Sequence, residues 1–208
     1  MLSTPMSYLA HRGVSPDAMI RFDLGYDSDA RALTIPAVRS GIQVGTLYHY
    51  LAPADGCWYR WKPGSLPWLF NGDAITHPST GIAVITKGVM DALTVWDCLG
   101  RVGEPKSVLV SQAEACGLPG AWGWQSDYAS LFAGKRVVVL VADDFAGRAM
   151  LANVSKDLEG FSSAIMPGGM DVNDFARARG RLNLRRLIED LADDCSEPVR
   201  IVSPLRAA

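Results

Sequence analysis

Residues 82–93 read IAVITKGVMDAL, and this segment combines three patterns. The first five residues form an apolar run of the kind found in a strand that is buried on both faces. A turn at Lys87 and Gly88 follows, and Met90 opens a segment with helical periodicity. The segment therefore predicts a strand, a turn and a helix, with Lys87 and Asp91 near the carboxyl end of the strand.

The same alternation continues along residues 81–166, where apolar runs, turns and helical patterns repeat. Active residues of α/β sheets lie at the carboxyl ends of the strands. Alternating strands and helices predict an α/β fold, with a parallel sheet of about four strands flanked by helices. The expected strands are 82–86, 107–111, 136–142 and 164–166, and the expected helices are 90–99, about 126–132 and about 147–158. Two further helices are expected at 171–178 and 184–191.

Before residue 79 the sequence does not show this alternation of apolar runs and helical patterns, and it predicts a small mixed α+β unit. Ser15 and Pro16 suit the N-cap and first position of a short helix over 16–22. Short aromatic and β-branched runs predict an antiparallel sheet; they are 32–35, 43–50, 57–61 and 68–70. We therefore expect an N-terminal α+β subdomain (1–78), a parallel-sheet domain (79–180), and a C-terminal helix with a flexible tail (181–208).

Composition narrows the function classes. The chain has 208 residues, 49% of them hydrophobic, and 20 Lys and Arg against 22 Asp and Glu, which gives a net charge of −2. This balance excludes the overall positive field of a strong non-selective nucleic-acid binder, so any such contact is local. Four scattered cysteines without C-x-x-C pairs argue against a zinc site. Without an apolar run near 20 residues, we expect a cytoplasmic protein with no membrane partner.

Four segments meet at the predicted strand ends, and together they carry five aspartates and seven glycines. They are residues 86–91, 116–124, 141–148 and 168–174. Carboxylates that converge from several strands form a hard-oxygen site suited to Mg²⁺, the usual ion of phosphoryl transfer.

The order of these segments resembles the catalytic core of DnaG-type and phage primases. Their Toprim domain carries a Glu-Gly motif, then D-x-D-x-x-G, then a G-x-D-x-x-D-like segment. Residues 8–15, 22–26 and 33–36 are similar to the subdomain that precedes Toprim, so the resemblance covers roughly residues 7 to 180. It implies a Toprim-like sheet and a phage or mobile-element protein of DNA replication. Such enzymes synthesise RNA primers on single-stranded DNA or primer-template from nucleoside triphosphates with Mg²⁺ or Mn²⁺. A replicative helicase or a separate zinc module is the implied protein partner.

Two principal acids of that family are absent here. Lys87 stands in place of the Glu and Ala142 in place of the first Asp, whereas Asp144 keeps the second. Asp143 lies one residue after Ala142, the position of the family's first Asp, and a shift of one residue turns a strand side chain to the opposite face. Because a cation repels Mg²⁺, we expect weak metal binding and a pairing of Lys87 with Asp144 or Asp91. The predicted catalytic residues are Lys87, Asp91 and Asp144, and the predicted metal ligands are Asp143, Asp144, Asp171 and Asp174.

Each of these residues also has a purely structural interpretation. Lys87 on a turn suits a solvated side chain, and Asp91 suits the first turn of a helix, where the macrodipole favours an acid. Asp143 and Asp144 both suit helix caps, a role that the pattern favours for Asp143. Asp171 and Asp174 suit a turn and an N-cap.

Candidate nucleic-acid contacts lie on a strand and two loops. In a strand over 57–61, Trp58, Arg60 and Lys62 share one face, which combines aromatic stacking with phosphate contact. An edge strand guarded by charges explains the same pattern. Gly120 offers an exposed amide to a phosphate, and Arg148 a cation. The indoles of the Gly-rich loop, Trp122 and Trp124, are expected to pack under it.

Two hypotheses about function follow from these residues. In the first, the protein is a DNA primase or another Toprim nucleotidyltransferase with a weakened metal site. In the second, it is a catalytically inactive Toprim module that binds nucleic acid, nucleotide or a replication partner.

Overall fold

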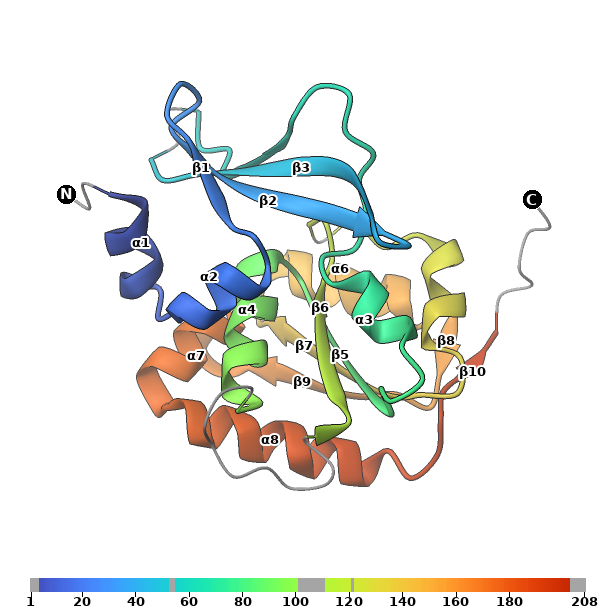
Figure 1. Ribbon diagram of the computed structural model, residues 1–208. Coiled ribbons are helices and arrows are strands. Elements are labelled where there is room, and N and C mark those ends of the chain that lie inside the picture. The colour runs from blue at the N-terminus through green and yellow to red at the C-terminus, as the bar shows by residue number, and fades with distance from the viewer. Residues whose placement is uncertain (1–3, 53–54, 101–110, 121, 203–208) are drawn as a thin grey trace.

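The computed structural model describes residues 4–52, 55–100, 111–120 and 122–202. In Figure 1 an antiparallel sheet lies above a parallel sheet, and helices surround the latter. In chain order the elements are α1 (Pro5–His11), α2 (Pro16–Arg21), β1 (Gly25–Asp27), β2 (Ala32–Arg39), β3 (Ile42–Tyr50), β4 (Tyr59–Trp61), α3 (Gly72–Thr76), β5 (Ile82–Thr86), α4 (Val89–Cys98), β6 (Ala113–Gly117), the 3₁₀ helix η1 (Ser126–Phe132), β7 (Arg136–Ala142), α6 (Phe145–Val154), β8 (Leu158–Glu159), β9 (Ser162–Met166), the 3₁₀ turn η2 (Pro167–Gly169), α7 (Val172–Arg179), α8 (Arg181–Asp194) and β10 (Arg200–Ile201).

The antiparallel sheet has the strand order β1-β2-β3-β4, so β4 lies at its edge. The predicted helix α2 is confirmed, and the Ser15 side chain caps it by accepting a hydrogen bond from the Ala18 amide. The strand predicted at Trp68–Phe70 was wrong. Phe70 makes only an isolated bridge to Gly117, and the short helix α3 follows.

The parallel sheet has the order β6-β5-β7-β9, and all three strand pairings are parallel, as predicted. β5 and β7 have the bounds that the apolar runs predict. Of the strand expected at 107–111, residues 107–110 lie outside the described residues. The strand that pairs with β5 on that side is β6, over Ala113–Gly117.

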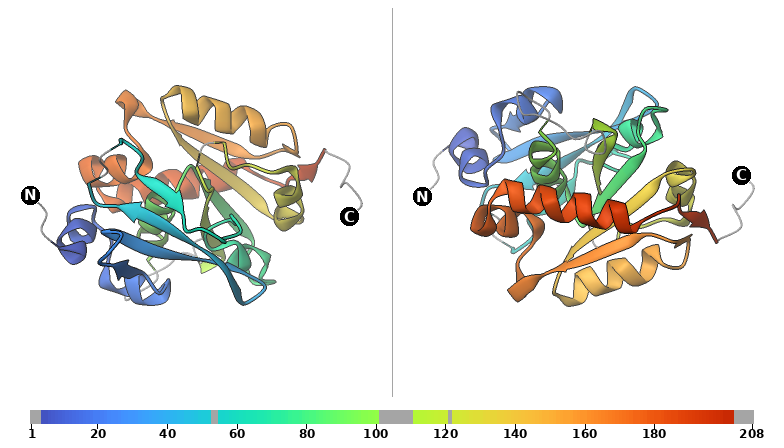
Figure 2. Two further views of the ribbon diagram at one scale, coloured as in Figure 1. Left: turned by 90° about the horizontal axis from the view of Figure 1, so that it is seen from above. Right: turned by 90° about the horizontal axis from the view of Figure 1, so that it is seen from below.

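Alternate residues of β5 face two hydrophobic layers. Ile82 and Val84 pack into the cluster that holds the buried residues of α4, α7 and α8. Ala83 and Ile85 pack into the cluster formed with η1 and α6. The two views of Figure 2 show α6 and α8 on opposite faces of the sheet. This burial on both faces explains why the strand has no polar residue before Thr86.

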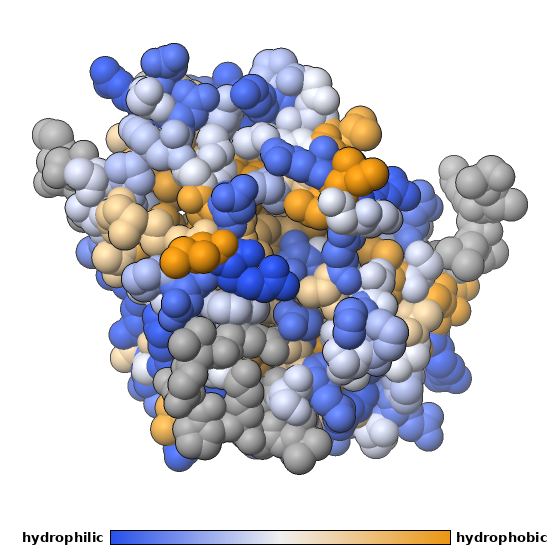
Figure 3. Space-filling view, in the orientation of Figure 1, coloured by the Kyte–Doolittle hydropathy of each residue, from blue (hydrophilic) through white to orange (hydrophobic). Residues whose placement is uncertain are grey.

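The C-terminal part is more ordered than the sequence predicts. The helix predicted at 184–191 is confirmed as α8, which spans Arg181–Asp194. Arg200–Ile201 pairs with β8, so the predicted flexible tail was wrong for these two residues. Within the described ranges, the helices are too short or too polar to cross a membrane. On the face shown in Figure 3, apolar residues occur in separate groups among hydrophilic ones.

Candidate functional site

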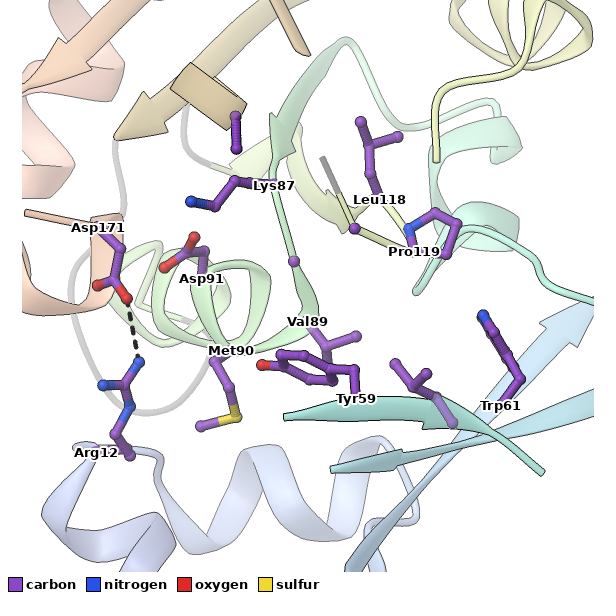
Figure 4. A pocket seen from close by; sticks show the side chains of 14 residues that line it. Arg12, Tyr59, Trp61, Lys87, Val89, Met90, Asp91, Leu118, Pro119 and Asp171 are labelled. Atoms are coloured by element: carbon purple, nitrogen blue, oxygen red, sulfur yellow. Dashed lines mark hydrogen bonds and ion pairs between the residues drawn. The ribbon is translucent and has the colours of Figure 1, made fainter. Parts of the chain in front are cut away.

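A pocket of about 330 Å³ opens at the carboxyl end of β5, between the two sheets. Lys87, Gly88 and Asp91 approach it from the end of β5 and the start of α4, and Leu118 to Gly120 line it from the loop after β6. Figure 4 shows Tyr59 and Trp61 of β4 bordering the pocket on the side of the antiparallel sheet. The topology therefore brings the predicted strand-end segments to one place.

Lys87 forms an ion pair inside this region. Its Nζ donates to Oδ2 of Asp144 at 2.9 Å, and only 25% of the Lys87 side chain is exposed. The solvated side chain was therefore the wrong interpretation, and the predicted pairing with Asp144 is confirmed. Partial desolvation opposes ionisation of Asp144, but the bonds from Lys87 and the Gly147 amide outweigh it and lower the pKa of this carboxyl.

Asp144 is also the N-cap of α6. Its Oδ1 accepts from the Gly147 amide at 2.6 Å, a contact that satisfies one of the free donors at the helix start. Asp143, for which the sequence favoured the capping role, instead forms an exposed ion pair with Arg148. That cap assignment was wrong, because the helix starts one residue later than Asp143 requires.

A second ion-pair group forms at the start of α7. Arg12 donates to Asp171 at 3.2 Å and lies 3.8 Å from Asp174. Asp171 also caps α7 by accepting from the Asp174 amide at 2.6 Å, so its structural interpretation as a helix cap is confirmed. Figure 4 marks the Arg12 to Asp171 bond at the border of the pocket.

Asp91 lies between the two ion pairs and is 7% exposed. Burial and the nearby Asp171 carboxylate raise its pKa to about 7, although the Asn173 amide, Lys87 and Arg12 act in the opposite direction. Its Oδ1 accepts from the Asn173 amide at 3.1 Å. The residue therefore changes protonation near neutral pH, unlike an ordinary aspartate in the first turn of a helix.

The carboxylates do not fit the metal pair that the family resemblance implies. Asp144 already binds Lys87 and a backbone amide, and Asp171 binds Arg12 and another. Ala142 has no ligand to offer. Across the described ranges, no group of three His, Cys, Asp or Glu side chains could hold a metal ion. The four predicted ligands, Asp143, Asp144, Asp171 and Asp174, are divided among three sets of ion pairs, so in this arrangement basic side chains occupy them.

The strand predicted to contact nucleic acid presents its opposite face to the pocket. Tyr59 and Trp61 line the pocket, whereas Trp58, Arg60 and Lys62 are exposed outside it. The edge-strand interpretation agrees with the position of β4 in its sheet. Of the two other residues predicted to contact nucleic acid, Gly120 in the loop after β6 lines the pocket, and Arg148 in α6 lies outside its lining.

The two indoles of the Gly-rich loop have different environments. The Trp124 ring nitrogen donates to Asp157 at 2.7 Å, and its ring packs beside Phe132, so packing was the correct prediction there. Trp122 is 65% exposed, so the same prediction was wrong for it.

Sequence reasoning did not assign Arg12, Tyr59 or Trp61 to the pocket. Strand alternation separates Tyr59 and Trp61 from Arg60, and this signal was available. The Arg12 pairing with Asp171 has no sequence signal, because the two residues lie 159 positions apart.

One relative with a similar sequence fixes the family. The protein is 35% identical over 124 residues to the gene 57 protein of Mycobacterium phage D29, which covers 59% of this chain and 72% of the phage protein. This chain belongs to the family of the phage D29 gene 57 protein. No protein-family model matches it.

Solved primase structures share the fold at lower identity. The Aquifex aeolicus primase, crystallised as its zinc-binding and RNA polymerase domains, is 20% identical with a TM-score of 0.68; the match covers 96% of this chain and 57% of the Aquifex chain. The RNA polymerase domain of Mycobacterium tuberculosis DnaG, in complex with a double-stranded DNA oligomer with an overhang, is 18% identical with a TM-score of 0.65 and coverages of 92% and 74%. The predicted primase-type fold with its Toprim-like sheet is therefore confirmed.

Proposed function

We propose that this protein acts in DNA replication as a primase-type module that holds single-stranded DNA or a primer-template strand at the strand-end pocket. In this proposal the pocket works without a resident pair of divalent cations. The observation that carries it is the ion pair between Lys87 Nζ and Asp144 at 2.9 Å, at the position where the family resemblance places a metal-binding acid.

The chemistry of the pocket supports binding more strongly than catalysis. Phosphoryl transfer depends on metal ions that bridge phosphate oxygens, and it loses orders of magnitude when principal ligands are replaced. Aromatic side chains suit a single nucleic-acid strand, and Tyr59 and Trp61 supply them here. Arg12 and Lys87 offset the nearby carboxylates, so the pocket does not present a cluster of uncompensated negative charge to the strand. The DNA complex of the M. tuberculosis relative supports DNA as the ligand class.

A second candidate function is RNA primer synthesis from nucleoside triphosphates with Mg²⁺ or Mn²⁺. The shared primase fold favours it, together with the presence of Asp91 and Asp171 in the pocket. A replicative helicase or a separate zinc module is the proposed protein partner in either case.

Primer synthesis and strand binding, measured on the same proteins, separate the two candidates. We compare the unaltered protein with a Lys87→Glu, Ala142→Asp double variant, using single-stranded DNA, labelled nucleotides and either metal. The binding proposal expects the unaltered protein to bind DNA without forming primers, and product to appear only with the double variant. Equal product from both proteins would support the primase and contradict the metal-independent module. Absence of DNA binding by the unaltered protein would refute the binding function itself.

A further inference from the structure

Two large aromatic side chains are exposed in segments that also contribute residues to the pocket lining. Trp122, in the loop after β6, is 65% exposed, and Phe145, at the first position of α6, is 78% exposed. Their ring centroids lie 5.9 Å apart at an interplanar angle of 55°. The two rings therefore touch each other and still present much of their surface to solvent.

The strand order brings the segments that carry these two rings to the end of β5. β6 and β7 flank β5 on either side, so the loops that follow them meet above its carboxyl end. Gly120 and Ala146, which line the pocket, lie two residues before Trp122 and one residue after Phe145. Both rings therefore belong to segments that reach the pocket on the side of the Toprim-like sheet, although neither ring is among the side chains that line it.

Local backbone geometry holds the two rings in this position. Pro119 and Gly123 pack closely, because a Cβ on Gly123 would lie 2.7 Å from the proline ring, and the Gly123 amide donates to Gly120. Phe145 follows Asp144, which is fixed by Lys87 and by its capping bond. Arg148 lies three residues after Phe145, on the same side of the helix.

We propose that Trp122 and Phe145 form a base-stacking platform for single-stranded nucleic acid that leads into the strand-end pocket. This inference rests on the proposed nucleic-acid function, and it identifies the bases as the part of the strand that is recognised. Tyr59 and Trp61 line the pocket itself, and the exposed pair adds two rings on segments next to it. Single strands bind to such sets of aromatic side chains by stacking their bases on them. The neighbouring charges are balanced by the pairs Lys87–Asp144 and Arg148–Asp143. Base stacking, and not phosphate attraction, is therefore the main source of affinity at this site.

Strand binding by the full chain tests the platform directly. Fluorescence anisotropy compares a labelled oligothymidylate with an abasic strand of equal length, which carries the same phosphates without bases. The Trp122→Leu, Phe145→Leu double variant should bind oligothymidylate about 5-fold to 150-fold more weakly, the range expected for loss of stacking on one base. A Tyr26→Leu variant, which removes an exposed aromatic ring on β1, serves as the matched control and should bind normally. Oligothymidylate should also quench tryptophan fluorescence less in a single Trp122→Leu variant than in the unaltered protein.

The outcomes distinguish the platform from the wider function. Equal affinity for the abasic strand and oligothymidylate, or full affinity in the double variant, would overturn the platform and leave DNA binding intact. If no strand binds to the unaltered protein, both the platform and the proposed DNA-binding function are refuted. If the double variant keeps its affinity but loses self-association in light scattering, the rings form a protein contact and the platform is refuted.

Discussion

Replacing Lys87 with Met tests whether the ammonium takes the place of a divalent cation. Met keeps an apolar side chain of similar length and removes the charge of Lys87. Arg12 is then the cation that is left to balance the carboxylates of Asp91, Asp144 and Asp171. At 2.9 Å the attraction between Lys87 and Asp144 is about 1.4 kcal/mol in water and roughly 6 kcal/mol at an effective dielectric constant of 20. Because 44% of the Asp144 side chain is exposed, the lower value applies, and screening reduces it to about 1 kcal/mol. The melting temperature should fall by roughly 2–4 °C.

Addition of Mn²⁺ should further distinguish the thermal stability of Lys87→Met from that of the unaltered protein. The unaltered protein should melt at the same temperature with and without the ion. In Lys87→Met the uncompensated carboxylates should bind it, and Mn²⁺ at about ten times its dissociation constant should add roughly 1.4 kcal/mol of stability. Thermal unfolding and titration calorimetry measure both effects, with Lys62→Met as a control for loss of an exposed lysine. Equal stabilisation of the unaltered protein by Mn²⁺, or a two-ion binding isotherm at micromolar concentrations, would refute this reasoning.

Three further changes test other contacts. Burial and the Asp171 carboxylate raise the pKa of Asp91 to about 7 in the folded protein, against about 3.9 in an unfolded chain, so the folded state loses stability as the pH rises between these two values. Asp91→Asn should become more stable than the unaltered protein between pH 5 and pH 8, as measured by urea unfolding; an unchanged difference across this range would contradict the assignment. Tyr8→Phe removes a 2.6 Å bond to the buried His49 and should cost about 1–3 kcal/mol in the same assay, whereas a neutral effect would show that the bond contributes nothing. Gly147→Ala should destabilise the fold by about 1–3 kcal/mol despite the better helix propensity of Ala, because the new Cβ would lie 2.2 Å from the Ala142 carbonyl oxygen; a more stable variant would refute the steric argument.

Sequence reasoning located the central strands because burial on both faces leaves a continuous apolar signal. β5 and β7 follow this rule. β6 reads Ala-Glu-Ala-Cys-Gly, a sequence of low strand propensity, and its pairing with β5 determines its conformation. Propensity alone could not place it.

The candidate site was only partly predictable for a similar reason. Lys87 was recognisable because it interrupts a local motif. It forms an ion pair with Asp144 because the paired strands β5 and β7 end next to each other. The partner of Asp171 is Arg12, whose position depends on how α1 packs against the start of α7. The exposure of Phe145 likewise depends on where α6 begins. Such information belongs to tertiary structure and is not contained in any short segment.

Asp144 and Asp171 each act both as a helix cap and as an ion-pair partner, and this affects how motifs in related proteins should be interpreted. Each carboxylate starts a helix and neutralises a basic side chain, so each is useful to a chain that never handles a metal ion. Selection for folding would then preserve both acids after enzymatic activity had disappeared. The presence of these two aspartates in a related sequence is therefore weak evidence of enzymatic activity, because a helix cap and an ion pair are sufficient reasons to keep them.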